Sequence, residues 1–357
     1  MKKERLNKLL NKMKNNSIEQ MIISSPASIF YLTGKWIEPG ERMLVLYINT
    51  DGSCKLYINA LFPIEEDLGA ELVVYNDTED SVKILAETVE NKKLAVDKNW
   101  PSHFLIRLMN LKRELSLING SPLIDEVRMI KDEEEIKLMK EASKVNDKVV
   151  AEAIKLLKED YDEKTMCKLL AGLYEKEGTD AFSFYPLIAY GKNAAEPHHD
   201  SDRSKLKAGD SVILDIGGLT NRYCSDMTRT VFYKQVSEEA KKVYNLVLEA
   251  NLAGIAAVKP GVKFSDIDRA SRNVIENGGY GKYFTHRTGH NIGIDVHEFP
   301  DVSSVNDMIA EPGMIFSIEP GIYLPGNLGV RIEDLVVVTD KGAEVLNSYT
   351  KDLQIVE

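Results

Sequence analysis

Histidines and carboxylates that could bind metal ions gather in the second part of the sequence. Five of the six histidines lie between residues 198 and 297, whereas residues 1–122 contain only His103. A single histidine is more often a core or surface residue than a ligand, so this clustering acquires meaning only with the acidic residues around it. Four carboxylates stand beside apolar, strand-forming residues in the same part of the chain: Asp215, Asp226, Glu319 and Glu333.

The surroundings of these carboxylates are too apolar for unpaired charges. Asp215 lies in an apolar stretch at 212–218, where burying an isolated carboxylate would be costly. Asp215 alone could also cap a turn before Gly217. Salt bridging to Arg331 is a second alternative, but one arginine cannot neutralise four carboxylates. With His290 added, the set favours two divalent ions about 3.5–4 Å apart, and manganese, cobalt, iron and zinc all remain possible.

Other catalytic patterns are missing from the sequence. His297-Glu298 is followed by Phe299 and Pro300, so the H-E-x-x-H zinc motif is absent. Neither a G-x-S-x-G nucleophile elbow nor a G-x-x-x-x-G-K-[ST] phosphate loop occurs. Serine hydrolase and nucleotide hydrolase activities are therefore not expected.

The elements that must position these residues are predicted from apolar periodicity. Helices are expected at 132–158, 162–177, 237–257 and 264–277, and strands at 183–190, 211–216, 228–233, 314–318 and 335–339. This pattern predicts an α+β domain with helices packed on one face of a mainly antiparallel sheet. If residues 219–221 form a hairpin turn, Asp215 and Asp226 can face the same side.

The preceding residues predict a separate, smaller α/β domain. Helices are expected at 2–15, 79–90 and 101–111, alternating with strands at 21–23, 43–48, 54–59, 94–96 and 115–118. The turn-rich segment 119–122 marks the expected junction. The sequence therefore predicts an N-terminal domain over residues 1–122 and a catalytic domain over 123–357.

Composition limits the partners and the location of the protein. The net charge of -11 over 357 residues disfavours nucleic acid and anionic membrane surfaces. The sequence contains no run of eighteen apolar residues, so no membrane-spanning helix is expected. Three widely separated cysteines suggest neither disulfides nor a thiolate zinc site. A cytoplasmic, reducing environment is expected.

The second domain resembles the creatinase/aminopeptidase P/prolidase group of pita-bread metallopeptidases. The resemblance rests on eight strings in the order of the family: 126–131, 191–198, 215–217, 225–230, 286–290, 295–298, 319–321 and 329–334. Eight such strings make chance resemblance very improbable. The resemblance implies a pita-bread catalytic domain preceded by a creatinase/prolidase N-terminal-like domain, which would gate substrates and contribute to a homodimer.

The resemblance also implies roles for individual residues. Asp215 resembles the bidentate ligand of one ion, His290 and Glu319 resemble ligands of the other, and Asp226 and Glu333 resemble the bridges. The two ions, for which Mn²⁺ is favoured, would activate a bridging hydroxide. Glu319 would also accept a proton during catalysis.

Four more residues correspond to groups that handle substrate and protons. His198 and His297 resemble histidines that contact the substrate, and His198 would help to stabilise an oxyanion. His286 resembles a residue that lines the site, and Arg331 one that orients a carboxylate and helps to move protons. His199 is better read as an ordinary loop histidine. Asn291 departs from the usual glycine after the metal-binding histidine, which leaves the nearby pocket wall open to change.

These matches imply hydrolysis of an Xaa-Pro bond at the N-terminal end of a small peptide that has proline at its second position. A dipeptidase is slightly favoured over an aminopeptidase for longer substrates. A non-enzymatic binding module and a metal-free creatinase-like hydrolase remain alternatives. The presence of all five ligand residue types argues against both.

Overall fold

The computed structural model describes residues 1–179 and 181–357, which form two compact units, Met1–Arg128 and Met129–Glu357. The expected junction after residue 122 falls within helix α5 (Ser121–Arg128), which belongs to the first unit. A proline at the second helical position is compatible with helix initiation, so the turn signal at 119–122 introduces a helix rather than a linker.

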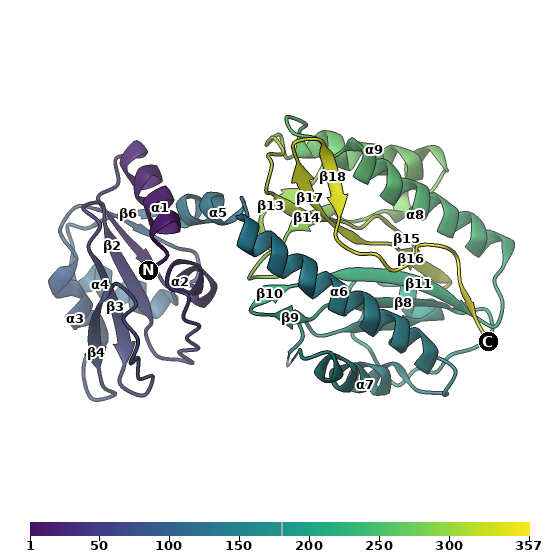
Figure 1. The fold of residues 1–357 in the computed structure, drawn as a ribbon, viewed down its shortest axis with the longest axis horizontal. Helices are drawn as coiled ribbons and strands as arrows, with labels where there is room; N and C mark the ends of the chain where they lie inside the picture. The colour runs from purple at the N-terminus through teal and green to yellow at the C-terminus, as the bar shows by residue number, and fades with distance from the viewer. Residues whose placement is uncertain (180) are drawn as a thin grey trace. The chain divides into compact units, whose positions relative to one another are not determined.

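The first unit has a mixed sheet with helices packed against it (Figure 1). The strand order is β4-β3-β2-β1-β5-β6, and the strands are β1 (Gln20–Ile23), β2 (Val45–Asn49), β3 (Cys54–Asn59), β4 (Glu71–Tyr75), β5 (Lys93–Val96) and β6 (Ser116–Asn119). The helices are α1 (Lys3–Asn15), α2 (Pro26–Thr33), α3 (Ser81–Thr88), α4 (Ser102–Leu111) and α5. Both β5 and β6 run parallel to β1, the arrangement of a small α/β layer domain.

In the second unit, two pairs of helices pack on mainly antiparallel sheets (Figure 1). One sheet has the order β19-β11-β8-β7, with β7 (Leu187–Tyr190), β8 (Ser211–Ile216), β11 (Met227–Tyr233) and β19 (Ile355–Val356). The other has the order β13-β12-β14-β17-β18, with β12 (Gly289–Asn291), β13 (Glu298–Val302), β14 (Ile315–Ile318), β17 (Asp334–Thr339) and β18 (Gly342–Val345). Two separate hairpins complete the second unit. They are β9 (Leu219–Thr220) with β10 (Tyr223–Cys224), and β15 (Gly321–Leu324) with β16 (Leu328–Arg331).

Each sheet is covered by one helix pair. Helices α6 (Glu133–Leu156) and α7 (Glu163–Lys176) bury Val150 and Leu170 against Leu214 of β8. Helices α8 (Glu238–Ala257) and α9 (Phe264–Asn277) cover the other sheet, where Phe264 packs edge-on against Phe316 at 5.1 Å between ring centroids. Short 3₁₀ helices occur at Gly191–Ala195 and Gly281–Tyr283. This α+β fold agrees with the expected pita-bread domain.

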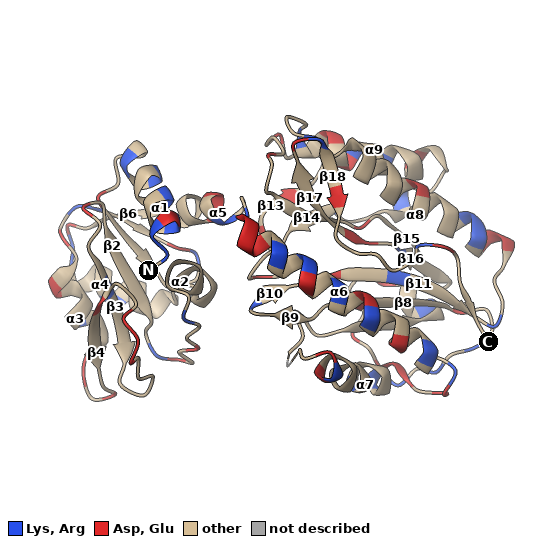
Figure 2. Cartoon of the chain, viewed as in Figure 1, with Lys and Arg blue, Asp and Glu red and all other residues tan. Residues whose placement is uncertain are grey.

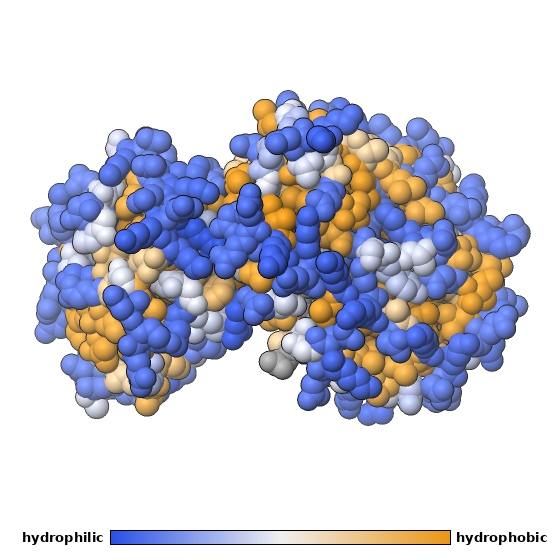
Figure 3. Space-filling view, viewed as in Figure 1, coloured by the Kyte–Doolittle hydropathy of each residue, from blue (hydrophilic) through white to orange (hydrophobic). Residues whose placement is uncertain are grey.

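Basic and acidic residues both recur along helices such as α6 (Figure 2). The viewed face of each unit is mainly hydrophilic, with hydrophobic patches between the polar side chains (Figure 3). Among the described residues, no helix has the length and apolar character that a membrane crossing would require.

Candidate metal and active site

The two predicted aspartate ligands lie at the ends of neighbouring antiparallel strands. Thr228 of β11 stands opposite Asp215 of β8, and Asp226 immediately precedes β11. Between the strands, the chain turns through Asn221 and Arg222, whose φ angles of 49° and 71° are typical of a two-residue hairpin turn. Gly217 permits the close approach, because a Cβ there would lie 2.1 Å from the carbonyl oxygen of Ser225.

The other three predicted ligands come from the second sheet and the β15–β16 hairpin. His290 lies in β12, Glu319 directly follows β14, and Glu333 lies between β16 and β17. The glycine before His290 is required by packing, since a Cβ on Gly289 would lie 1.9 Å from the carbonyl oxygen of Ser317. The fold therefore brings side chains from both sheets to one place.

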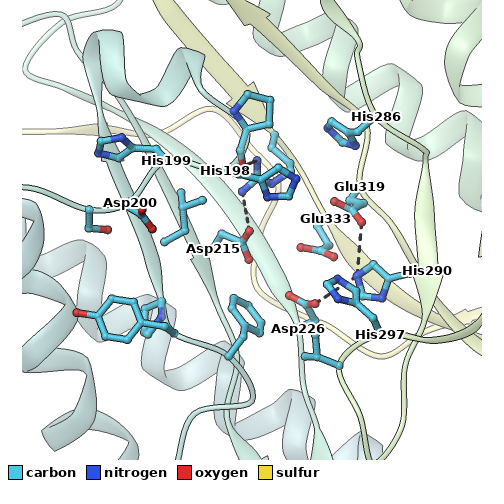
Figure 4. Close-up of a pocket in the computed structure, with 18 of the residues that line it drawn as sticks. His198, His199, Asp200, Asp215, Asp226, His286, His290, His297, Glu319 and Glu333 are labelled. Carbon is cyan, nitrogen blue, oxygen red and sulfur yellow. Dashed lines mark hydrogen bonds and ion pairs between the residues drawn. The ribbon is translucent and has the colours of Figure 1, made fainter. Parts of the chain in front are cut away.

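These side chains converge in one buried cluster (Figure 4). Ligand atoms of Asp226, His290 and Glu333 all lie within 4.8 Å of one another. Nε2 of His290 is 3.6 Å from Oδ2 of Asp226 and 3.5 Å from Oε1 of Glu319. Nδ1 of His290 is 3.2 Å from the carbonyl oxygen of Asn291, which only accepts, so a neutral ring directs its Nε2 lone pair toward the carboxylates.

Burial and mutual repulsion make the ionised carboxylates costly without a cation. Burial raises the pKa of Glu319 from 4.5 to about 7. Burial and neighbouring carboxylates raise the pKa of Asp226 and that of Glu333 well above the usual range. Oδ1 of Asp215 and Oδ1 of Asp226 are buried and have no hydrogen-bond donor among the described residues. Two divalent cations would satisfy these oxygens and restore the ionised forms.

Arg331 ties two of the carboxylates into one hydrogen-bonded chain. Its Nη2 donates to Oδ2 of Asp215 over 2.6 Å, and its Nε donates to Oγ1 of Thr228 over 3.1 Å. The Thr228 hydroxyl in turn donates to Oε2 of Glu333 over 2.8 Å. The guanidinium therefore fixes one oxygen of each carboxylate and leaves the other available for an ion.

A third hydrogen bond of Arg331 leads through Tyr323 to His286. Nη1 of Arg331 donates to the Tyr323 hydroxyl over 2.9 Å, and that hydroxyl lies 2.9 Å from Nε2 of His286. Nδ1 of His286 lies 2.8 Å from the carbonyl oxygen of Arg287 and must donate to it. Nε2 of the neutral ring is then the acceptor for the tyrosine O–H. Burial and the Arg331 charge lower the pKa of His286 to about 4, which keeps the ring neutral.

The predicted site residues all line one cavity of about 620 Å³. His198 and His297 are exposed at its wall, and the His297 ring stands nearly perpendicular to the His290 ring at 4.3 Å between centroids. Burial and the charge of Arg287 lower the pKa of His297. Both histidines can thus present donors to a molecule in the cavity, as Figure 4 shows.

His199 is held by Glu163, a residue to which sequence analysis assigned no role. Its Nε2 lies 2.8 Å from Oε2 of Glu163, which is fully buried in the first turn of α7. Glu163 also accepts hydrogen bonds from the backbone N–H of Tyr190 and Asp202 and from the Asn193 amide, at 2.7–2.9 Å. Each oxygen thus has two donors, and the carboxylate fixes the ends of the segment that carries His198.

Tyr323 and Glu163 carried no recognisable spacing signal, because their partners are distant in sequence. Thr228 lies inside the string 225–230, so that string could have identified it. Asn291 lies in extended β12, where its Nδ2 donates to the carbonyl oxygen of Pro300 over 2.9 Å. Asn291 is not among the residues that line the cavity described above, so the departure from glycine does not place a side chain in the cavity wall.

Comparisons with known proteins find relatives for both units of the chain. Residues 137–340 match metallopeptidase family M24, and residues 5–130 match the creatinase/prolidase N-terminal domain. The chain is 36% identical over 360 residues to an uncharacterized peptidase of Staphylococcus aureus strain MRSA252, covering 97% of this chain and 99% of the relative.

Solved structures extend the likeness to the whole fold. A recombinant prolidase from Thermococcus sibiricus is 37% identical with a TM-score of 0.94, covering 100% of this chain and 99% of that one. An Xaa-Pro dipeptidase from Bacillus anthracis is 29% identical with a TM-score of 0.91, covering 100% of both chains.

Proposed function

Because the chain belongs to metallopeptidase family M24, we propose that it is a two-metal peptidase that hydrolyses the Xaa-Pro bond at the N-terminal end of dipeptides or short peptides. The observation that carries this proposal is the buried cluster of Asp226, His290 and Glu333 within 4.8 Å. Unpaired oxygens of Asp215 and Asp226 in the same cavity support it.

Each proposed ligand has an assignment in this scheme. Asp215 would hold one ion, His290 and Glu319 would hold the other, and Asp226 and Glu333 would be shared between the two. When bound, two such ions lower the pKa of water and polarise a carbonyl group. Mn²⁺ is the proposed native metal, and Co²⁺, Fe²⁺ or Zn²⁺ would suit the same mixture of carboxylates and one imidazole.

The remaining side chains act on the substrate and on protons. His198 and His297 donate hydrogen bonds to the carbonyl oxygen as charge develops on it. Glu319 accepts the proton released during hydrolysis. Arg331 keeps Asp215 oriented through the 2.6 Å hydrogen bond.

Specificity for proline is supported by the relatives named above and by the cavity wall. An imide bond to proline offers no N–H, and the ring is rigid and apolar, so recognition depends on apolar contact. Phe184, Leu187 and Val296 provide such a surface in the cavity. A cytoplasmic homodimer, with the first unit contributing to substrate gating, remains part of the proposal.

Hydrolysis of Gly-Pro, Ala-Pro, Ala-Pro-Ala and Ala-Ala with added Mn²⁺, before and after chelation, tests the proposed function. Cleavage of the proline substrates alone, lost on chelation and restored by Mn²⁺, is the expected result. Activity that survives complete metal removal contradicts the two-metal mechanism and favours a metal-free hydrolase. No hydrolysis of any substrate by metal-loaded protein favours a binding module. The ratio of Ala-Pro to Ala-Pro-Ala cleavage decides between a dipeptidase and an aminopeptidase.

A further inference from the structure

A single buried asparagine joins the backbones that carry both predicted glutamate ligands. Asn251 of α8 is fully buried, and its Nδ2 donates to the carbonyl oxygens of Ile318 over 2.9 Å and Ile332 over 3.3 Å. These residues immediately precede Glu319 and Glu333. One amide group therefore fixes the relative positions of two segments that come from the second sheet and the β15–β16 hairpin.

Two other buried asparagines do the same for the aspartates. Nδ2 of Asn146, on α6, donates over 2.8 Å to the carbonyl oxygen of Ile216, the residue after Asp215. Nδ2 of Asn347, which follows β18, donates over 3.3 Å to the carbonyl oxygen of Asp226 itself. Each of the four carboxylate segments is thus held by an asparagine amide at the carboxylate residue or its neighbour.

The second half of each carboxamide is also occupied, which fixes its orientation. Oδ1 of Asn146 accepts from the Tyr174 hydroxyl, Oδ1 of Asn251 accepts from Lys351 Nζ over 3.0 Å, and Oδ1 of Asn347 accepts from the Leu335 backbone N–H over 2.7 Å. Because carbonyl oxygens only accept, the NH₂ side of each amide must face the ligand-bearing backbone. The amide is neutral, so it holds that backbone without competing with a cation for the carboxylates.

We propose that Asn146, Asn251 and Asn347 are positioning residues that set the geometry of the metal-binding carboxylates through their backbones. This inference rests on the proposed function, in which those carboxylates hold two ions. Ligand positions must be held within about 0.5 Å for productive geometry, and residues behind the ligands typically change metal affinity about 10- to 100-fold. The three amides would supply this rigidity where the side chains themselves repel one another.

The orientation of the amides allows a selective test. An Asn→Asp change retains the accepting oxygen and the side-chain volume but removes the amide donor to the ligand-bearing backbone. Asn251→Asp is therefore compared with Asn251→Leu, which removes both the amide donor and the accepting oxygen without adding charge. Ser271→Ala is the matched control, because Ser271 is fully buried and its hydroxyl donates over 2.9 Å to the carbonyl oxygen of Ala250 in α8, not to the backbone of a ligand-bearing segment.

Two readouts are independent of peptide hydrolysis. Calorimetric titration of metal-free protein with Mn²⁺ gives affinity and stoichiometry, and the visible absorption of Co²⁺-loaded protein reports ligand geometry. We expect both Asn251 variants to bind Mn²⁺ about 10- to 100-fold more weakly and to alter the Co²⁺ spectrum. Ser271→Ala should match wild type in both readouts even if its melting temperature falls.

The outcomes separate this inference from the proposed function. Wild-type affinity and an unchanged Co²⁺ spectrum in both Asn251 variants overturn the inference while leaving a two-metal site intact. If Asn251→Asp weakens Mn²⁺ binding but Asn251→Leu does not, the effect comes from the added charge, and the inference is again overturned. Wild-type protein that binds no divalent ion overturns the proposed function and this inference with it. If the Asn251 variants do not fold, Asn347→Asp, which keeps the bond from Leu335, is judged by the same criteria.

Discussion

The guanidinium of Arg331 pairs with Asp215 through one oxygen, with Nη2 of the arginine 2.6 Å from Oδ2 of the aspartate. Oδ1 of the same aspartate is buried without a donor among the described residues. The ion pair therefore orients the carboxylate without satisfying it. Such a half-paired carboxylate is suited to accept a metal ion on its second oxygen.

Replacing Arg331 with lysine should lower kcat for Ala-Pro about 10- to 100-fold, because an ammonium group cannot reach Asp215, Thr228 and Tyr323 together. Steady-state kinetics with saturating Mn²⁺ measures the change. Arg42→Lys is the control, since Arg42 makes a forked contact with Asp77 in the first unit, outside the proposed site. Equal activity of the two variants would show that the geometry of Arg331 is dispensable.

Replacing Asp226 with asparagine should abolish turnover and lower the number of ions bound. The same change should stabilise the metal-free protein, because it removes a carboxylate that burial and neighbouring carboxylates disfavour. We expect a gain on the order of 1 kcal/mol or more in the free energy of unfolding at neutral pH. Denaturant unfolding of chelated protein and metal analysis of loaded protein test both parts. A variant that turns over normally would exclude Asp226 as a bridging ligand.

The contribution of Glu319 to the stability of metal-free protein should fall as the pH rises from 4.5 to about 7, the interval over which the pKa of Glu319 is raised. In this interval the unfolded chain has lost the Glu319 proton while the folded protein retains it, so raising the pH favours unfolding. Melting temperatures of chelated wild type and Glu319→Gln across this interval isolate the contribution. Parallel curves for the two proteins would contradict the raised pKa.

Metal binding should show the opposite pH dependence. Ions bind the ionised carboxylates, so affinity should increase over the same interval as protons are displaced. Titration with Mn²⁺ in buffers of different ionisation enthalpy measures the released protons directly. Affinity that is constant between pH 4.5 and 7 would mean that Glu319 is not a ligand.

Replacing Glu163 with alanine should loosen the segment that carries His198. The change leaves the donors of Tyr190, Asn193 and Asp202 without their acceptor, at a cost on the order of 3 kcal/mol in stability. We also expect kcat to fall more than tenfold.

The neighbouring residue supplies the control for that change. Asp162 caps α7 by accepting from the Thr165 N–H over 2.7 Å, and Asp162→Ala should cost about 1 kcal/mol with little change in kcat. Similar kinetics for both variants would indicate that Glu163 stabilises the fold but does not position His198.

Much of the fold could be predicted from local pattern. The long amphipathic helices α6 and α8 were expected close to their observed bounds, because periodicity over twenty or more residues is unambiguous. Short strands such as β12 and β15 were not expected, since three or four residues carry too little periodicity. Residues 183–186 were expected to extend β7 but lie outside it, and Pro186 directly before the strand provides the reason.

Some residues of the site could likewise be identified from the sequence, and others could not. Asp215, Asp226 and Glu333 could be selected because a carboxylate among apolar residues is conspicuous in sequence. Asn251 and Tyr323 could not, because a buried amide or phenol is recognised only by its partners. Those partners become neighbours only after the sheets have formed, and Asn251 lies 67 positions from Ile318.

The contact between Asn347 and Asp226 spans 121 positions along the chain. During synthesis, Asp215 and Asp226 emerge well before His290, Glu319 and Glu333, and Asn347 emerges later still. A nascent chain that ends before residue 290 carries Asp215 and Asp226 but none of the other three proposed ligands. If these five residues hold the ions as proposed, the order of translation delays tight metal capture until almost the whole second unit has been made.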